Sequence, residues 1–127
     1  MIDHVSVGVR DLEASAAFYE AALAPIGFKK LREKPGTVGF GKKDHGEFWL
    51  NHRPDMQKPA ADSGVHVCLR ASTTKAVDDF HAAAVKAGAT SDGAPGVRPE
   101  YSTSYYAAFV RDLDGNRIEV VTFLPAT

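Results

Sequence analysis

The chain has 127 residues, 44% of them hydrophobic, and its 15 basic and 16 acidic residues leave a formal charge of −1. This composition fits one domain over residues 1–127 and gives no basic excess for binding nucleic acid. The single cysteine, Cys68, excludes an internal disulfide; no secretory signal or long apolar segment is seen, so we expect a cytoplasmic protein without a membrane partner.

The first part of the chain predicts a βαβββ module over residues 1–52. Residues 2–10 alternate apolar and polar side chains, which predicts a strand buried on one face. Asp11 is suited to cap a helix over residues 12–24, whose apolar side chains recur at helical spacing until Gly27. Three β-rich runs then follow, at residues 28–33, 37–42 and 47–52.

A second βαβββ module is predicted over residues 64–127, after a proline-rich polar connector at residues 53–63. A strand over residues 65–71 and a helix over residues 76–87 repeat the beginning of the first module. The β-run expected next is interrupted by glycine and proline, at Gly93, Pro95, Gly96 and Pro99. The last two runs flank the step Asp114-Gly115, which favours a tight hairpin turn.

These elements predict an α+β fold, in which two βαβββ modules form a curved mixed sheet. Each helix covers one face of its sheet and leaves the other face open, so two sheets side by side form a cup. Alternation along the strands assigns the residues to faces. With Val5/Val7, Phe48/Leu50, Val65/Val67 and Ile118/Val120 facing the helices, the cup carries His4, Trp49, His66 and Glu119.

Three of these cup residues, His4, His66 and Glu119, are candidate metal ligands. Two imidazoles and one carboxylate suit a divalent metal such as Fe, Mn, Ni, Co or Zn, and leave coordination positions open for substrate. Glu119 also lies in the apolar run IEVV, where a buried carboxylate needs a partner. The alternative is that this face is solvated and its polar residues have no function.

Three further residues are candidates for contacting a substrate: Trp49, Arg70 and Tyr106. Trp49 would form an aromatic floor, and Arg70 would hold an anionic group. Tyr106 reaches the cup if residue 108 lies opposite residue 119 across the hairpin. The alternative to substrate contact is that the Trp49 and Tyr106 rings only pack against their neighbours and that Arg70 is solvated.

Three segments, HVSVGVRDLEASAAFYEAALAPIGF, GVHVCLRA and AAFVRDLDGNRIEVV, resemble the vicinal oxygen chelate superfamily. Its members include glyoxalase I, extradiol dioxygenases, and the fosfomycin- and bleomycin-resistance proteins. The resemblance implies the glyoxalase-type fold, with His4, His66 and Glu119 as metal ligands and Glu119 also as a proton acceptor. It further implies a homodimer, in which swapped modules would join His4 of one chain to His66 and Glu119 of the other.

The resemblance leaves several reactions open. Trp49 stands where glyoxalase I carries a glutamate, which argues against a standard glyoxalase I unless Glu47 substitutes through a change of register. The expected function is that of a divalent-metal-dependent lyase or dioxygenase, acting on a small substrate chelated through vicinal oxygens. The alternatives are a metal-free drug-binding protein of the bleomycin-resistance kind and a fosfomycin-modifying thiol transferase.

Overall fold

The computed structural model describes residues 1–125 and contains two helix-covered sheets. The first half contains β1 (Val5–Val9), α1 (Leu12–Leu23), the short 3-10 helix η1 (Ala24–Ile26), β2 (Lys29–Lys34), β3 (Thr37–Gly41) and β4 (Phe48–His52). The second half contains β5 (Val67–Arg70), α2 (Thr74–Lys86), β6 (Thr90–Val97), β7 (Tyr105–Arg111) and β8 (Arg117–Phe123).

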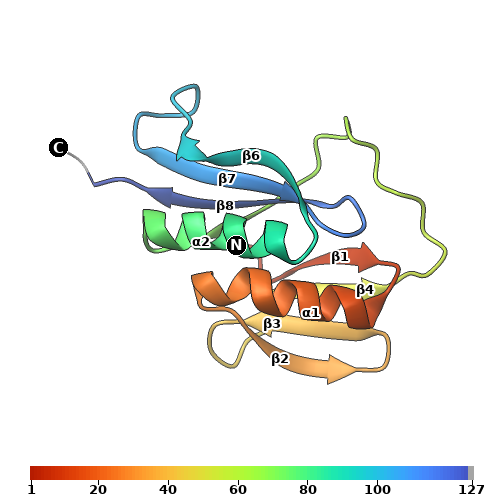
Figure 1. Cartoon of the computed structure of the whole chain (residues 1–127). Helices are drawn as coiled ribbons and strands as arrows, with labels where there is room; N and C mark the ends of the chain where they lie inside the picture. Colours follow the sequence, from red (N-terminus) through yellow and green to blue (C-terminus); the bar gives the residue numbers. More distant parts are fainter. Residues whose placement is uncertain (126–127) are drawn as a thin grey trace.

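The two sheets have the same topology. Their strand orders are β1-β4-β3-β2 and β5-β8-β7-β6, with one parallel pair in each, β1 with β4 and β5 with β8. The two helices lie side by side and cover the same side of both sheets (Figure 1). The predicted α+β fold with repeated βαβββ modules is therefore confirmed. We call the face of each sheet opposite its helix the cup face.

α1 begins at the predicted residue, and α2 begins at Thr74, two residues before its predicted start. The Asp11 carboxylate accepts from the backbone N of Ala14 at 3.1 Å, and Thr73 caps α2 in the same way. One hydrophobic core joins both helices to both sheets, and it contains the residues predicted to face the helices except Val65. Val65 is exposed because β5 begins only at Val67. Within residues 1–125, no helix is long and apolar enough to cross a membrane.

The connection between β7 and β8 is longer than the expected tight turn. Arg111 pairs with Arg117, so five residues separate the two strands. The Asp112 carboxylate closes this loop by accepting from the backbone N of Asp114 at 2.8 Å and of Asn116 at 2.9 Å. Gly115 supplies the left-handed conformation, with φ of 94°.

The same loop ties the second module to the first. The Tyr19 hydroxyl of α1 donates to Asp112 Oδ2 at 2.5 Å. Asp114 Oδ1 accepts from both the backbone N and Nε of Arg10, at 3.0 and 2.9 Å, and Oδ2 accepts from Ser15 at 3.3 Å. Both aspartates are buried, so these contacts keep the two carboxylates hydrogen-bonded out of solvent.

The interrupted run after α2 forms a strand despite its glycines and prolines. β6 pairs with β7, and its register shifts twice, between Ser91 and Gly93 and between Gly93 and Gly96. β6 is an edge strand, where proline and bulges are tolerated because one side of the strand has no pairing to lose. The glycines and prolines after α2 therefore mark bulges within β6 and do not end the strand.

Candidate functional site

The candidate site is centred on Glu119, on the cup face of the second sheet. Glu119 lies in the middle of β8, between Cys68 of β5 and Phe109 of β7. Its side chain is only 2% exposed, although its face of the sheet is opposite the main core. Burial of a carboxylate in this position requires hydrogen-bond donors from neighbouring strands.

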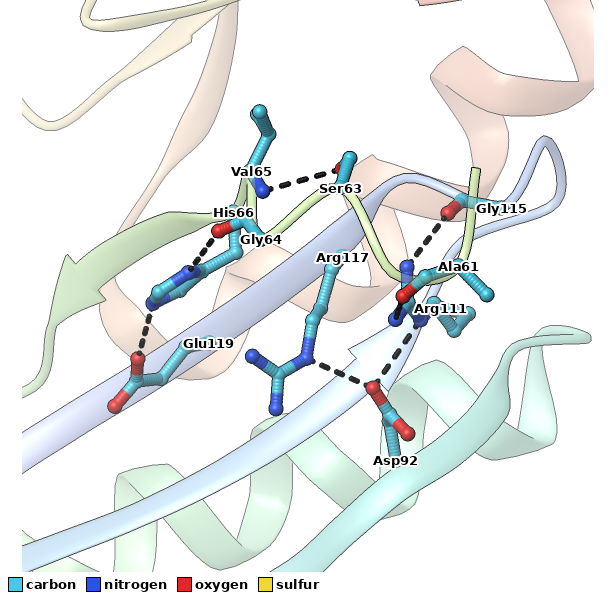
Figure 2. Close-up of polar contacts among 10 residues, drawn as sticks. All are labelled: Ala61, Ser63, Gly64, Val65, His66, Asp92, Arg111, Gly115, Arg117 and Glu119. Atoms are coloured by element: carbon cyan, nitrogen blue, oxygen red, sulfur yellow. Dashed lines mark hydrogen bonds and ion pairs between the residues drawn. The ribbon is translucent and has the colours of Figure 1, made fainter. Parts of the chain in front are cut away.

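Two side chains supply those donors, one to each carboxylate oxygen. Nε2 of His66 lies 3.0 Å from Oε1 of Glu119, and the two side chains point toward each other (Figure 2). The Tyr105 hydroxyl donates to Oε2 at 2.5 Å. The His66 side chain is 34% exposed, so the pair has one buried and one accessible partner.

The environment of Glu119 keeps the neighbouring hydroxyl and thiol protonated. Burial, together with the hydrogen bond to Glu119, raises the pKa of Tyr105 above its ordinary value. Burial and the charge of Glu119 raise the pKa of Cys68 to about 12. Tyr105 is therefore a hydrogen-bond donor at neutral pH, and Cys68 is a thiol without the thiolate character that a nucleophile needs.

His4, the third predicted ligand, does not join this pair within one chain. Its Nδ1 lies 2.7 Å from Oδ1 of Asp3, which also lies 3.1 Å from Nε2 of His45. His4 and His66 border one cavity of about 570 Å³, which opens between the first strands of the two sheets. Within residues 1–125, no three His, Cys, Asp or Glu side chains gather closely enough to hold a metal ion. One chain thus brings together two of the three predicted ligands, His66 and Glu119.

The prediction that Tyr106 lies on the cup face is wrong, because the register between β7 and β8 differs by one residue from the one expected. Phe109, not Ala108, lies opposite Glu119, which turns Tyr106 toward the helices. Its hydroxyl donates to Asp78 of α2 at 2.6 Å. The tyrosine on the cup face is Tyr105, whose neighbour along the same face is Ala107.

Trp49 and Arg70 both lie on cup faces, one in each sheet. The Trp49 indole covers Gly39 and donates to the carbonyl of Gly46 at 3.1 Å. Arg70 lies at the end of β5, with its guanidinium carbon 4.5 Å from the ring centre of Phe123. A larger cavity of about 950 Å³ lies between α1 and β2, but its described lining includes none of the predicted site residues.

Comparison with known proteins identifies the family and agrees with the fold. Residues 1–120 match the family described as Glyoxalase/Bleomycin resistance protein/Dioxygenase superfamily. The crystal structure of a glyoxalase/bleomycin resistance protein from Albidiferax ferrireducens T118 shares 31% identity, covering 94% of this chain and 96% of its own, with a TM-score of 0.82.

Two other solved structures share the fold at lower identity. A hypothetical protein from S. aureus is 27% identical over 92% of both chains, with a TM-score of 0.69. A glyoxalase/bleomycin resistance protein/dioxygenase family enzyme from Burkholderia phytofirmans PsJN is 22% identical, covers 97% of this chain and 98% of its own, and has a TM-score of 0.72. No curated protein matches the sequence.

Proposed function

Because the chain belongs to the glyoxalase/bleomycin resistance protein/dioxygenase superfamily, we propose that it is a divalent-metal-dependent enzyme acting on a small substrate chelated through vicinal oxygens. The observation that carries this proposal is the pairing of His66 with Glu119 on the cup face, beside a cavity of about 570 Å³. Cavities of this size suit small-molecule ligands.

In the proposed site, Nε2 of His66 and Oε1 of Glu119 are two metal ligands. Tyr105 occupies Oε2, which leaves Oε1 as the oxygen presented to His66 and to a metal. His4 of a second copy of the chain supplies the third ligand in a homodimer. This arrangement is supported by the position of β1 and β5 at sheet edges and by the 53% exposure of the His4 side chain.

A bound divalent metal would act as a Lewis acid that polarises the substrate oxygens. The residues of the chain then bind and orient the substrate. Glu119 is the group that would accept a proton from the substrate, and the Tyr105 hydrogen bond to Oε2 holds its carboxylate in one orientation. Trp49 offers an aromatic wall on the cup face of the first sheet, and Arg70 offers a cation at the open end of β5.

Metal analysis of protein purified without a histidine tag tests this proposal. We expect about one divalent ion per chain, and loss of that ion in the His4→Ala/His66→Ala variant. His52→Ala is a matched control, because His52 is exposed at the end of β4. Full metal content in the double variant would exclude these histidines as ligands.

One observation favours a second candidate, a metal-free binding protein of the bleomycin-resistance kind. Both carboxylate oxygens of Glu119 already have partners, from His66 and Tyr105, so its burial does not require a metal. In this case the cavity would bind a small molecule without chemistry. Saturable binding of bleomycin by protein treated with a chelator, without metal uptake by the native protein, would select this candidate.

A further inference from the structure

The cup face of the second sheet carries more positive than negative charge. Two carboxylates lie on it, those of Asp92 and Glu119. Four guanidinium groups accompany them, those of Arg70, Arg98, Arg111 and Arg117. The whole chain has a formal charge of −1, so this face is more positive than the rest of the molecule. Three of these arginines are half-buried and Arg70 is exposed, and an excess of positive charge on one face favours an anionic occupant.

Arg117 is held in place by two neighbours. Its Nε donates to Asp92 Oδ2 at 2.8 Å, and its guanidinium carbon lies 4.3 Å from the ring centre of Phe109. These contacts fix the plane of the guanidinium before any ligand arrives, which lowers the entropy lost on binding. Figure 2 shows this group between Glu119 and Asp92, with its terminal nitrogens directed away from Asp92.

The terminal nitrogens of Arg117 are available for a ligand. Among the residues that the structure describes, they make no hydrogen bond and no ion pair. Arg111 differs, since its three nitrogens contact Asp92, the carbonyl of Gly115 and the carbonyl of Ala61. Within residues 1–125, Arg111 therefore uses all three nitrogens in contacts within the fold, whereas Arg117 uses only Nε, which donates to Asp92.

A small hollow adjoins Arg117. Its volume is about 50 Å³, and its lining combines the polar residues Arg117, Arg111, His66, Ser63 and Asn116 with apolar residues, which are Val7, Pro59, Val65 and Val67. Its volume exceeds the roughly 30 Å³ that one water molecule occupies in the liquid, and Arg117 is the group there that could bind a carboxylate or a phosphate. The planar fork of a guanidinium matches the paired oxygens of either group.

We propose that Arg117 is the receptor for an oxyanion of the substrate, a carboxylate or a phosphate, at a subsite beside the Glu119–His66 pair. The inference rests on the proposed function for the rest of the substrate. Arg117 and Glu119 are two residues apart on one face of β8, which separates their Cα atoms by about 7 Å. The substrate therefore carries its anionic group only a few bonds from the oxygens that would chelate the metal.

An NMR titration of chelator-treated protein with inorganic phosphate, and separately with acetate, tests the subsite. At constant ionic strength, we expect saturable shifts of the Arg117 side-chain NH signal and of its neighbours with at least one of the two anions. Tighter binding of acetate would identify the anionic group of the substrate as a carboxylate, and tighter binding of phosphate would identify it as a phosphate. Absence of saturable shifts at Arg117 with both anions would overturn the proposal.

Variants separate the subsite from nonspecific charge attraction and from the metal site. Arg117→Gln should weaken anion binding by at least about tenfold, because it removes both charge-assisted hydrogen bonds of the guanidinium fork. Arg117→Lys keeps the charge without the fork and should lie between wild type and Arg117→Gln. Arg32→Gln on β2 is the matched control and should leave the affinity unchanged.

Metal uptake by the same variants distinguishes the two proposals. Normal metal uptake with an unchanged anion affinity in Arg117→Gln would overturn the subsite alone. If wild-type protein binds the anion through Arg117 but takes up no metal, the subsite proposal stands and the proposal of a metal-dependent function is excluded.

Discussion

The Tyr105 hydroxyl donates a 2.5 Å hydrogen bond to Oε2 of Glu119, a carboxylate whose side chain is 2% exposed. Tyr105→Phe leaves this buried oxygen without its donor, and we expect the free energy of unfolding to fall by about 1–3 kcal/mol. Urea denaturation monitored by circular dichroism measures the change.

Tyr106→Phe is the matched control for this measurement. It removes the same atom one residue along β7, but its partner Asp78 is exposed. We expect a change within about 0.5 kcal/mol. Equal losses in the two variants would show that the hydrogen bond to Glu119 contributes no more than a surface contact.

The position of Tyr105 explains why the sequence predicted one half of this pair and missed the other. Strand alternation correctly placed His66 and Glu119 on one face, because β5 and β8 are regular and pair directly. The length of the loop decides which residue of β7 lies opposite which residue of β8. The loop closed by Asp112 is longer than a two-residue Asp-Gly turn. That difference shifts the register by one and exchanges Tyr105 for Tyr106.

The hydrogen bond from Tyr19 to Asp112 joins α1 to the loop of the second module. Tyr19→Phe removes a donor from a buried carboxylate, and we expect a loss of about 1.5–3 kcal/mol in the free energy of unfolding. Tyr101→Phe, at an exposed position, is the control. Because the core is shared, the unfolding transition of Tyr19→Phe should remain single; two separate transitions would mean that the modules unfold independently.

Cys68 is expected to react slowly with alkylating agents, although part of the residue is exposed, because the surrounding strands desolvate its thiol. Burial and the charge of Glu119 raise the pKa of its thiol to about 12, so little thiolate forms at pH 8. Glu119→Gln removes the negative charge and should accelerate reaction with iodoacetamide, because the thiol pKa falls. The rate is measured by mass spectrometry, and an unchanged rate in the variant would remove Glu119 as a cause of the raised pKa.

Asp92 is expected to add stability that is lost in acid. Its hydrogen bond from Arg117 and the charge of Arg111 hold its pKa below the ordinary 3.8. A lowered pKa in the folded state stabilises the protein above pH 3.8, and this contribution disappears as the pH falls through the folded-state pKa.

The variant Asp92→Asn measures this contribution. Wild type should exceed the variant in free energy of unfolding by less than about 1 kcal/mol near pH 6, because Asp92 is partly exposed. The difference should shrink below about pH 4. A difference that grows toward low pH would have the wrong sign and would contradict the assigned cause.

His4 shows where strand patterns stop being informative. Alternation placed it on the cup face with His66, and both histidines border one cavity. Alternation says nothing about the distance between two edge strands or about which copy of the chain lies beside them. In one chain His4 contacts Asp3 instead, so its proposed role as a ligand requires a second copy of the chain.

Mixing two defective variants tests whether the metal site forms between chains. His4→Ala and His66→Ala should each lose metal as homodimers, since each lacks one ligand in both sites. In a swapped heterodimer, one site combines both substitutions and the other combines His4, His66 and Glu119 without substitution. Random exchange makes half of the dimers heterodimers with one intact site each, so about a quarter of the wild-type metal should return on mixing. Metal analysis after exchange and gel filtration measures this return. If all ligands came from one chain, mixing would restore none.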